Sequence, residues 1–238
     1  MSKVIQFKNY TETSVDMYIS GDISDDSWKG WSWGEDMDVY PSDIKTMLDN
    51  AKGKNINLYV NSGGGHISAG LAIAHMLQRH DGTVVGYVDA MACSIASVIM
   101  MACDEIHMPK DSYLMIHKPS SYCSGNADDM RKTADGLDTL QRGIMAAYER
   151  KLKDGVDIAT VEALVNAETW LTAEEASNYF DIIIDDSMNA VACTSELLEK
   201  YMKTPKNLFK NSKKDEQISG EKRIKQLKNK IDIALALA

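Results

Sequence analysis

One short stretch of this chain, residues 83–102, limits its fold most strongly, because a strand pattern changes there into a helix pattern. Residues 83–89 are rich in β-branched side chains and follow Gly82, which predicts a buried strand. Residues 95–102 are apolar and contain neither Gly nor Pro, which predicts a buried helix. Ser94 stands at the junction between the two. This pattern favours an α/β fold.

Ser94 is a candidate nucleophile because of its place at the start of the expected helix. Unpaired backbone N–H groups and the helix dipole favour a developing negative charge at that end, and acyl transfer requires such an environment. A serine that merely caps the helix is the simpler interpretation of this segment alone. A catalytic role therefore needs partner residues elsewhere in the chain.

A second strand-to-helix junction contains three consecutive glycines, residues 63–65. Residues 56–61 alternate apolar and polar side chains like a strand, and apolar residues recur at helical spacing from Ile67 to Leu77. Glycines at such a turn expose backbone N–H groups that could form half of an oxyanion hole, or they simply allow a tight turn. The run does not match G-x-G-x-x-G and lacks the Lys-Ser/Thr of a phosphate-binding loop, which disfavours a nucleotide site.

His117 and Glu168 are the candidate base and acid. Of the five histidines, only His117 ends an apolar, strand-like run that is followed by proline, and catalytic groups are typically found at such edges of a rigid scaffold. His66, directly after the glycines, is a minor candidate. Glu168 precedes a helix start that Thr172 and Glu175 mark as a capping box, and a histidine base needs a carboxylate to fix its tautomer. Spacing along the chain cannot show that these side chains meet the nucleophile.

Four motifs, in this order, resemble those of the Clp peptidase family. They are Asn61-Ser62-Gly63-Gly64-Gly65, Ala92-Cys93-Ser94-Ile95-Ala96-Ser97, Met115-Ile116-His117-Lys118-Pro119 and Glu168-Thr169-Trp170-Leu171-Thr172-Ala173-Glu174-Glu175-Ala176. The resemblance covers roughly residues 15–187, and residues 125–148 and 167–176 look most like the head maturation proteases of tailed phages and prophages. It implies an α/β fold of the Clp peptidase and crotonase type, with a repeated ββα superhelical core and a long protruding handle helix.

The resemblance also implies a site and its chemistry, which is that of a serine endopeptidase working through an acyl-enzyme. The implied residues are Ser94 as nucleophile, His117 as general base, Glu168 as orienting acid, and Gly64, Gly65 and Ile95 as N–H donors of the oxyanion hole. Two positions depart from the family pattern: Gly63 replaces the usual proline, and Glu168 stands where aspartate is usual. No cofactor and no metal are expected.

The resemblance further implies what the protein acts on and assembles with. Polypeptides are the expected substrates, with capsid and scaffold proteins of a phage head among them, and a homo-oligomeric ring is the expected assembly. A long helical pattern at residues 126–153 corresponds to the family's handle, through which two rings stack, or else packs on its own subunit. Docking of an AAA+ unfoldase stays open, and neither nucleic acid nor a membrane is expected as a partner.

Charge divides the chain into an acidic body and a basic tail. Residues 199–238 hold 11 Lys and Arg against 5 Asp and Glu, a net +6, whereas the remainder carries −15. Such a tail is typical of a solvated arm, and apolar residues near its end allow a short amphipathic helix that docks on a partner. The expected organisation is an N-terminal arm (1–14), a Clp-peptidase-like domain (15–198) and a partly disordered or helical basic tail (199–238).

The overall composition is that of a globular cytoplasmic enzyme. Hydrophobic residues make up 44% of the chain. A membrane span would require a run of about 18 apolar residues, and the sequence has none. An apolar signal core, which would indicate export, is not found either. The protein is expected to reside in a cytoplasm, which for a phage protein is the cytoplasm of the host. The four cysteines are expected to stay reduced there. Three alternatives stay open: a Cys93 nucleophile, a catalytically silent ring-forming structural protein, and a crotonase-like acyl-CoA enzyme that does not require Ser94 and His117 together.

Overall fold

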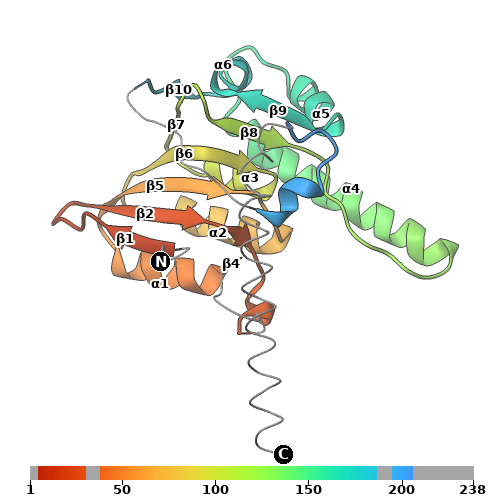
Figure 1. The fold of residues 1–238 in the computed structure, drawn as a ribbon, viewed down its shortest axis with the longest axis horizontal. Helices are drawn as coiled ribbons and strands as arrows, with labels where there is room; N and C mark the ends of the chain where they lie inside the picture. Colours follow the sequence, from red (N-terminus) through yellow and green to blue (C-terminus); the bar gives the residue numbers. More distant parts are fainter. Residues whose placement is uncertain (1–4, 31–37, 187–194, 206–238) are drawn as a thin grey trace, which may run out of the picture. The chain divides into compact units, whose positions relative to one another are not determined.

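A computed structural model describes residues 5–30, 38–186 and 195–205 of the chain. These residues form a mixed α/β fold around an eight-stranded sheet (Figure 1). The chain separates into two compact units, Met1–Met202 and Lys203–Ala238, and the fold and the site belong to the first. The expected amphipathic helix of the tail lies outside the described residues. Within the described part of the chain, no helix is long and apolar enough to cross a membrane.

The main sheet is mostly parallel. Its principal order is β1 (Ile5–Lys8), β2 (Ser14–Ser20), β5 (Asn55–Ser62), β6 (Val84–Cys93), β7 (Glu105–Met108) and β10 (Ile183–Ile184). Two further strands, β8 (Tyr113–Ile116) and β9 (Thr169–Thr172), extend it from β6. β1 and β9 run antiparallel to their neighbours, β2 and β8. The short strands β3 (Asp22–Ile23) and β4 (Asp38–Val39) form a separate parallel pair.

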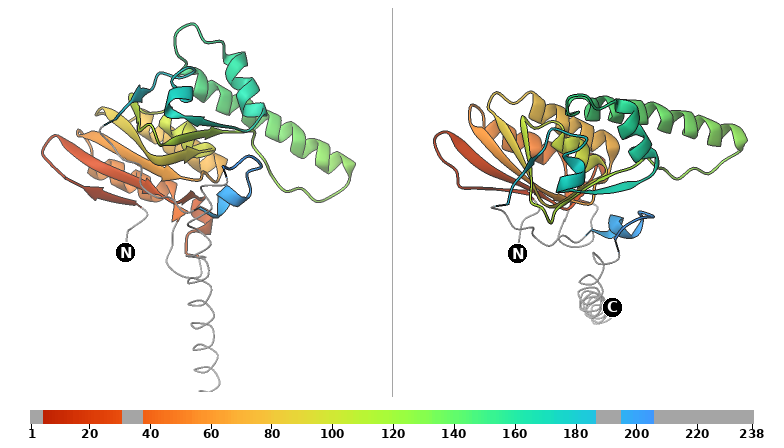
Figure 2. Two further views of the ribbon diagram at one scale, coloured as in Figure 1. Left: turned by 45° about the horizontal axis from the view of Figure 1, so that its top comes forward. Right: turned by 90° about the horizontal axis from the view of Figure 1, so that it is seen from above.

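Alternating side chains give the sheet a helix-covered face and an aromatic face. The buried core side chains of the central strands β2 and β5 are Val15, Met17, Ile19, Ile56, Leu58 and Val60. Three helices cover this side: α1 (Pro41–Asn50), α2 (Ile67–Gln78) and α3 (Ile95–Met100) (Figure 2). On the opposite side the rings of Tyr18, Tyr59 and Tyr87 stack across β2, β5 and β6, with centroids 4.7 and 4.9 Å apart. Side chains alternate between the two faces of a strand with a period of two residues, and this alternation therefore fixes which face of the sheet the helices cover.

Strand β6 is long enough to pair with two different neighbours along the same edge. Its residues Val85, Gly86 and Tyr87 pair with β7, whereas the residues from Met91 to Cys93 pair with β8. Strand β5 lies along its other edge, also parallel. Strands β5, β6 and β8 consequently point their carboxyl ends in the same direction. In parallel sheets, ligand sites form at that edge.

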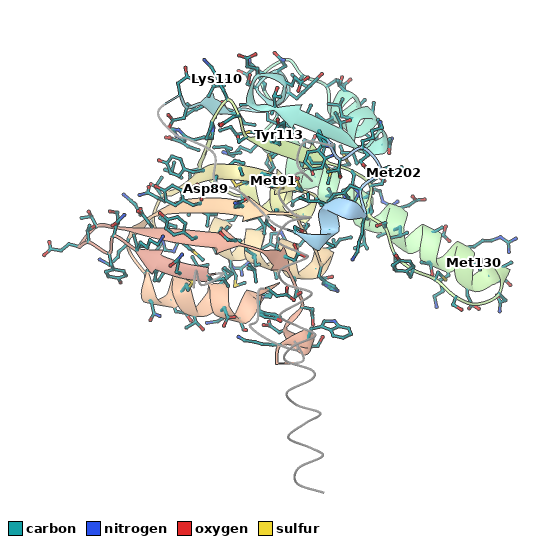
Figure 3. The ribbon with its side chains drawn as sticks, in the orientation of Figure 1. Asp89, Met91, Lys110, Tyr113, Met130 and Met202 are labelled. Carbon is teal, nitrogen blue, oxygen red and sulfur yellow. The ribbon has the colours of Figure 1, made fainter. Side chains whose placement is uncertain are left out.

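The long helix α4 (Ala127–Glu149) begins at a capping box that Asn126 and Asp129 form, within the range predicted for a helix. Its C-terminal half packs on the domain through buried Ile144 and Tyr148. Its N-terminal half extends away from the sheet, with Met130, 52% exposed, near the far end (Figure 3). The remaining helices are α5 (Ile158–Asn166), α6 (Ala173–Ala176) and the 3-10 turns η1 (Asp26–Trp28) and η2 (Glu196–Glu199). The capping box predicted at the start of α6 is confirmed.

Candidate active site

Parallel strands bring Ser94 and His117 together. Ser94 directly follows β6 and His117 directly follows β8, and these strands are parallel neighbours. The backbone N–H of Ser94 donates a hydrogen bond of 2.8 Å to the carbonyl of Met115, which extends the pairing one residue beyond β6. Ser94 Oγ and His117 Nε2 are 2.7 Å apart. With Nε2 unprotonated, the hydroxyl donates and the imidazole accepts, as a general base requires.

The backbone at Ser94 favours a functional role over a simple helix cap. Ser94 has φ 54° and ψ −125°, and its side chain makes no capping hydrogen bond to α3. A residue other than glycine at positive φ costs about 1–3 kcal/mol, and such residues cluster at functional sites. The sharp turn instead presents the hydroxyl to His117. The capping interpretation of Ser94 therefore does not describe this structure.

The pairing of β8 with β9 places Glu168 beside His117. Ile116 lies opposite Thr169 in this antiparallel pair, so His117 and Glu168 are the next residues on adjacent strands. Glu168 is only 8% exposed and has φ 49°. Burial lowers the pKa of His117 below its ordinary value of 6.5, while the carboxylate of Glu168 opposes that shift by stabilising the imidazolium. The register of β8 and β9 thus places the two side chains close enough for their charges to interact.

The glycine turn lies at the same edge, after β5. Gly64 and Gly65 have φ values of 101° and 142°, and a Cβ on Gly64 would lie 2.7 Å from Cβ of Ser94. The backbone thus passes directly beside the serine. The N–H of Gly64 donates to Ser62 Oγ at 3.1 Å and is already used in this arrangement. The N–H groups of Gly65 and Ile95 are the better candidates to bind an oxyanion. Ile95 is the first residue of α3, where backbone N–H groups lack intrahelical acceptors.

A cavity of about 390 Å³ opens beside the serine and the imidazole. Its apolar lining includes Ile67, Ile95, Val98, Ile144 and Val165. Tyr148 also lines the cavity, and its hydroxyl is hydrogen-bonded to the buried hydroxyl of Ser97 at 2.7 Å. Tyr148 therefore brings no unsatisfied polar group to the cavity wall. Burial raises the pKa of Tyr148, which keeps the phenol neutral. A cavity of this kind suits an apolar side chain of a ligand.

A segment that spans the expected boundary between the domain (15–198) and the tail (199–238) also lines the cavity. Residues 195–202, named here the covering segment, contribute Leu197, Lys200, Tyr201 and Met202. Figure 1 draws this segment in blue beside the carboxyl ends of the strands, and Figure 3 labels Met202 on it. No local pattern singled out Tyr201, because its contacts are with residues more than 80 positions earlier in the sequence.

The hypothesis of a Cys93 nucleophile can be compared with the structure. Cys93 is fully buried in β6 and does not line the cavity, whereas Ser94 does. The geometry thus favours the hydroxyl over the thiol as nucleophile. In the described ranges 5–30, 38–186 and 195–205, no group of three or more His, Cys, Asp or Glu side chains could hold a metal ion.

The fold and the site together define an α/β protein with a serine–histidine pair and a glycine turn at the carboxyl edge of its sheet, an arrangement suited to nucleophilic hydrolysis. The family model of the Clp protease matches residues 42–187. The chain belongs to the Clp protease family.

Curated relatives are named "ATP-dependent Clp protease proteolytic subunit". Those of Bacteroides fragilis and Bacteroides thetaiotaomicron are each 32% identical to this chain over 130 residues. The match covers 53% of this chain, and 61% and 58% of the two relatives. The chain thus spans about three fifths of the length of the curated relatives it matches.

Proposed function

We propose that this protein is a serine endopeptidase in which Ser94 attacks the peptide carbonyl. The observation that carries the proposal is the 2.7 Å hydrogen bond between Ser94 Oγ and His117 Nε2, made at a strained turn beside a cavity. A crotonase-like enzyme or a silent structural protein has no need of this pair. Membership in the Clp protease family supports the same conclusion.

The proposed reaction follows from the position of each group. His117 takes the Ser94 proton as Oγ bonds to the carbonyl carbon, and Glu168 stabilises the imidazolium that forms. The N–H groups of Gly65 and Ile95, with Gly64 after a small rearrangement of its contact to Ser62, stabilise the oxyanion. The imidazolium then protonates the leaving amine as the C–N bond breaks. Water, deprotonated by His117, hydrolyses the resulting acyl-enzyme.

The substrates that we propose are capsid and scaffold proteins of a tailed phage, cleaved during head maturation in a host cytoplasm. Residues 125–148 and 167–176 resemble phage head maturation proteases, and the apolar part of the cavity lining suits a polypeptide side chain. We propose that the protein works as a homo-oligomeric ring, and the exposed N-terminal half of α4 supports contacts between subunits or rings. Mass spectrometry of cut sites after coexpression with the capsid protein tests the substrate class.

Labelling with a fluorophosphonate tests the catalytic assignment directly. The full chain should acquire the label on Ser94 and cleave an unstructured polypeptide, whereas Ser94→Ala should lose both activities, with a fall in kcat of roughly 10⁶-fold. The variant should stay folded, because removing one hydroxyl leaves little cavity. Cys93→Ala is the matched control and should retain both. Cleavage by Ser94→Ala, or labelling that disappears only in Cys93→Ala, would refute the assignment.

A further inference from the structure

The covering segment is anchored to the domain next to the catalytic groups. Ser195 Oγ donates a 2.6 Å hydrogen bond to Asp22 Oδ1, and the N–H of Leu197 donates to Ser195 Oγ at 3.1 Å. Leu198 is buried, with 4% of its surface exposed. A Cβ built on Gly63 would lie 2.2 Å from Ser195 Oγ. The absence of a side chain at Gly63 is therefore what makes room for Ser195.

Tyr201 reaches from this segment into the centre of the site. Its hydroxyl donates to the carbonyl of Gly63 at 2.5 Å, and its ring packs edge-on against His117, with centroids 4.9 Å apart. The phenol oxygen lies 3.2 Å from the position that a Cβ on Gly64 would occupy, and that position is itself 2.7 Å from Cβ of Ser94. One side chain thus contacts the base and the glycine turn, and it lines the same cavity as the nucleophile.

This position conflicts with substrate binding. A reactive carbonyl must approach Ser94 Oγ and the oxyanion donors within about 3–3.5 Å. The phenol oxygen already lies beside Gly64, on the side of the glycine turn that faces Ser94, and Tyr201 lines the same cavity as Ser94, Gly65 and His117. Its one proton is donated to the carbonyl of Gly63, so in this arrangement Tyr201 blocks the site and does not donate to an oxyanion.

We infer that residues 195–202 form an autoinhibitory plug, in which Tyr201 closes the catalytic cavity until the segment moves away. The inference rests on the proposed function, because such a plug regulates only a site that reacts. Substrate then competes with the chain's own segment, and the apparent affinity for substrate equals the intrinsic affinity multiplied by the fraction of molecules in which the segment is displaced.

Two variants of the full chain displace the plug by independent routes. Tyr201→Ala removes the ring, whereas Gly63→Ala places a methyl group against Ser195. Both should raise kcat/KM for a short peptide, and the rate of fluorophosphonate labelling at Ser94, by about tenfold. Lys203→Ala, an exposed side chain that does not line the cavity, is the matched control and should leave both rates unchanged.

A second measurement does not depend on hydrolysis. Diethyl pyrocarbonate modifies accessible imidazoles, and peptide mapping gives the rate at His117 against the exposed His75 as internal reference. The rate at His117 should rise in Tyr201→Ala and Gly63→Ala, and stay unchanged in Lys203→Ala. Circular dichroism confirms that each variant is folded, and either displaced variant is sufficient for the test.

The combined outcomes separate the two proposals. Faster modification of His117 together with faster labelling and cleavage supports the plug. Faster modification with neither labelling nor cleavage in any variant supports the blocking contact but overturns the proposed peptidase function. Unchanged modification at His117, or a fall in kcat in both displaced variants, overturns the plug.

Discussion

The two sides of the catalytic cavity are held in place in different ways. On one side, backbone pairing positions the residues: Ser94 and His117 extend parallel strands, and Glu168 adjoins an antiparallel pair. On the other side, side-chain contacts hold the covering segment, through Ser195 on Asp22 and Tyr201 on Gly63.

This difference has an energetic consequence. Moving the catalytic residues apart would break sheet hydrogen bonds and expose buried strands, which involves much of the domain. Releasing the covering segment breaks side-chain hydrogen bonds, among them those of Ser195 and Tyr201, and uncovers the Tyr201 ring and Leu198, which is a more local event. The first side is therefore suited to fixed catalytic geometry, and the second to regulation.

The largest effect that tests this comparison is expected from Glu168→Gln. The strand register holds residue 168 in place whichever side chain it carries, so the fold and substrate binding should persist. The amide cannot stabilise an imidazolium, and loss of the corresponding carboxylate in other triads lowers kcat by about 10⁴-fold. Steady-state kinetics should show this fall in kcat with little change in KM.

The conservative variant Glu168→Asp is the matched control, because it keeps the charge and restores the residue usual in the family. It should retain far more activity than Glu168→Gln. Wild-type turnover in Glu168→Gln would show that the register-placed carboxylate is not the orienting acid.

Strand and helix patterns made the first side predictable. Residues 56–61 were expected as a strand and lie within β5, residues 83–89 were expected as a strand and all but Thr83 lie within β6, and the expected helix at 126–153 contains α4. Their apolar periodicity is local, so it is readable from sequence. Strand β6 continues to Cys93 because β8 pairs with its last residues, and a partner more than 20 positions away leaves no local signal.

The second side could not be predicted for the same reason. Tyr201 and Gly63 are 138 positions apart, and neither carries a pattern that indicates the other. The charge of residues 199–238 instead favoured a solvated tail, and Tyr201 was included in it. For Ser94, His117 and Glu168, the resemblance to a family supplied the spatial proximity that spacing could not, and the geometry is consistent with those roles.

The pH dependence of catalysis reports on both sides of the cavity at once. The base must be neutral, and burial lowers the pKa of His117 below 6.5, so the acid limb of kcat/KM should lie below pH 6.5. Activity should fall about tenfold for each pH unit below that pKa. Glu168→Gln removes the charge that raises this pKa, so its residual activity should show the limb at still lower pH. Tyr201→Ala reduces burial and should move the limb to higher pH.

A pH–rate profile with each variant, measured on the same peptide, checks these opposite shifts. Lys203→Ala supplies the reference profile. If the limb of the parent protein lay above pH 6.5, burial would not control the imidazole. Shifts in the same direction for both variants would contradict the separate contributions of the two sides.

The smallest expected effect, from Tyr201→Phe, sharpens the distinction between ring and hydroxyl. This variant keeps the edge-on contact with His117 and loses only the hydrogen bond to the carbonyl of Gly63. A hydrogen bond contributes about 0.5–1.5 kcal/mol net, but the ring still fills the same space, so kcat/KM should rise only about threefold, at the low end of that range. Rates of peptide hydrolysis, measured for Tyr201→Phe and Tyr201→Ala under the same conditions, test this expected rise in kcat/KM. Equal rates in the two variants would assign the block to the hydroxyl alone, whereas a rate at or below that of the parent would mean that the hydroxyl does not hold the segment in place.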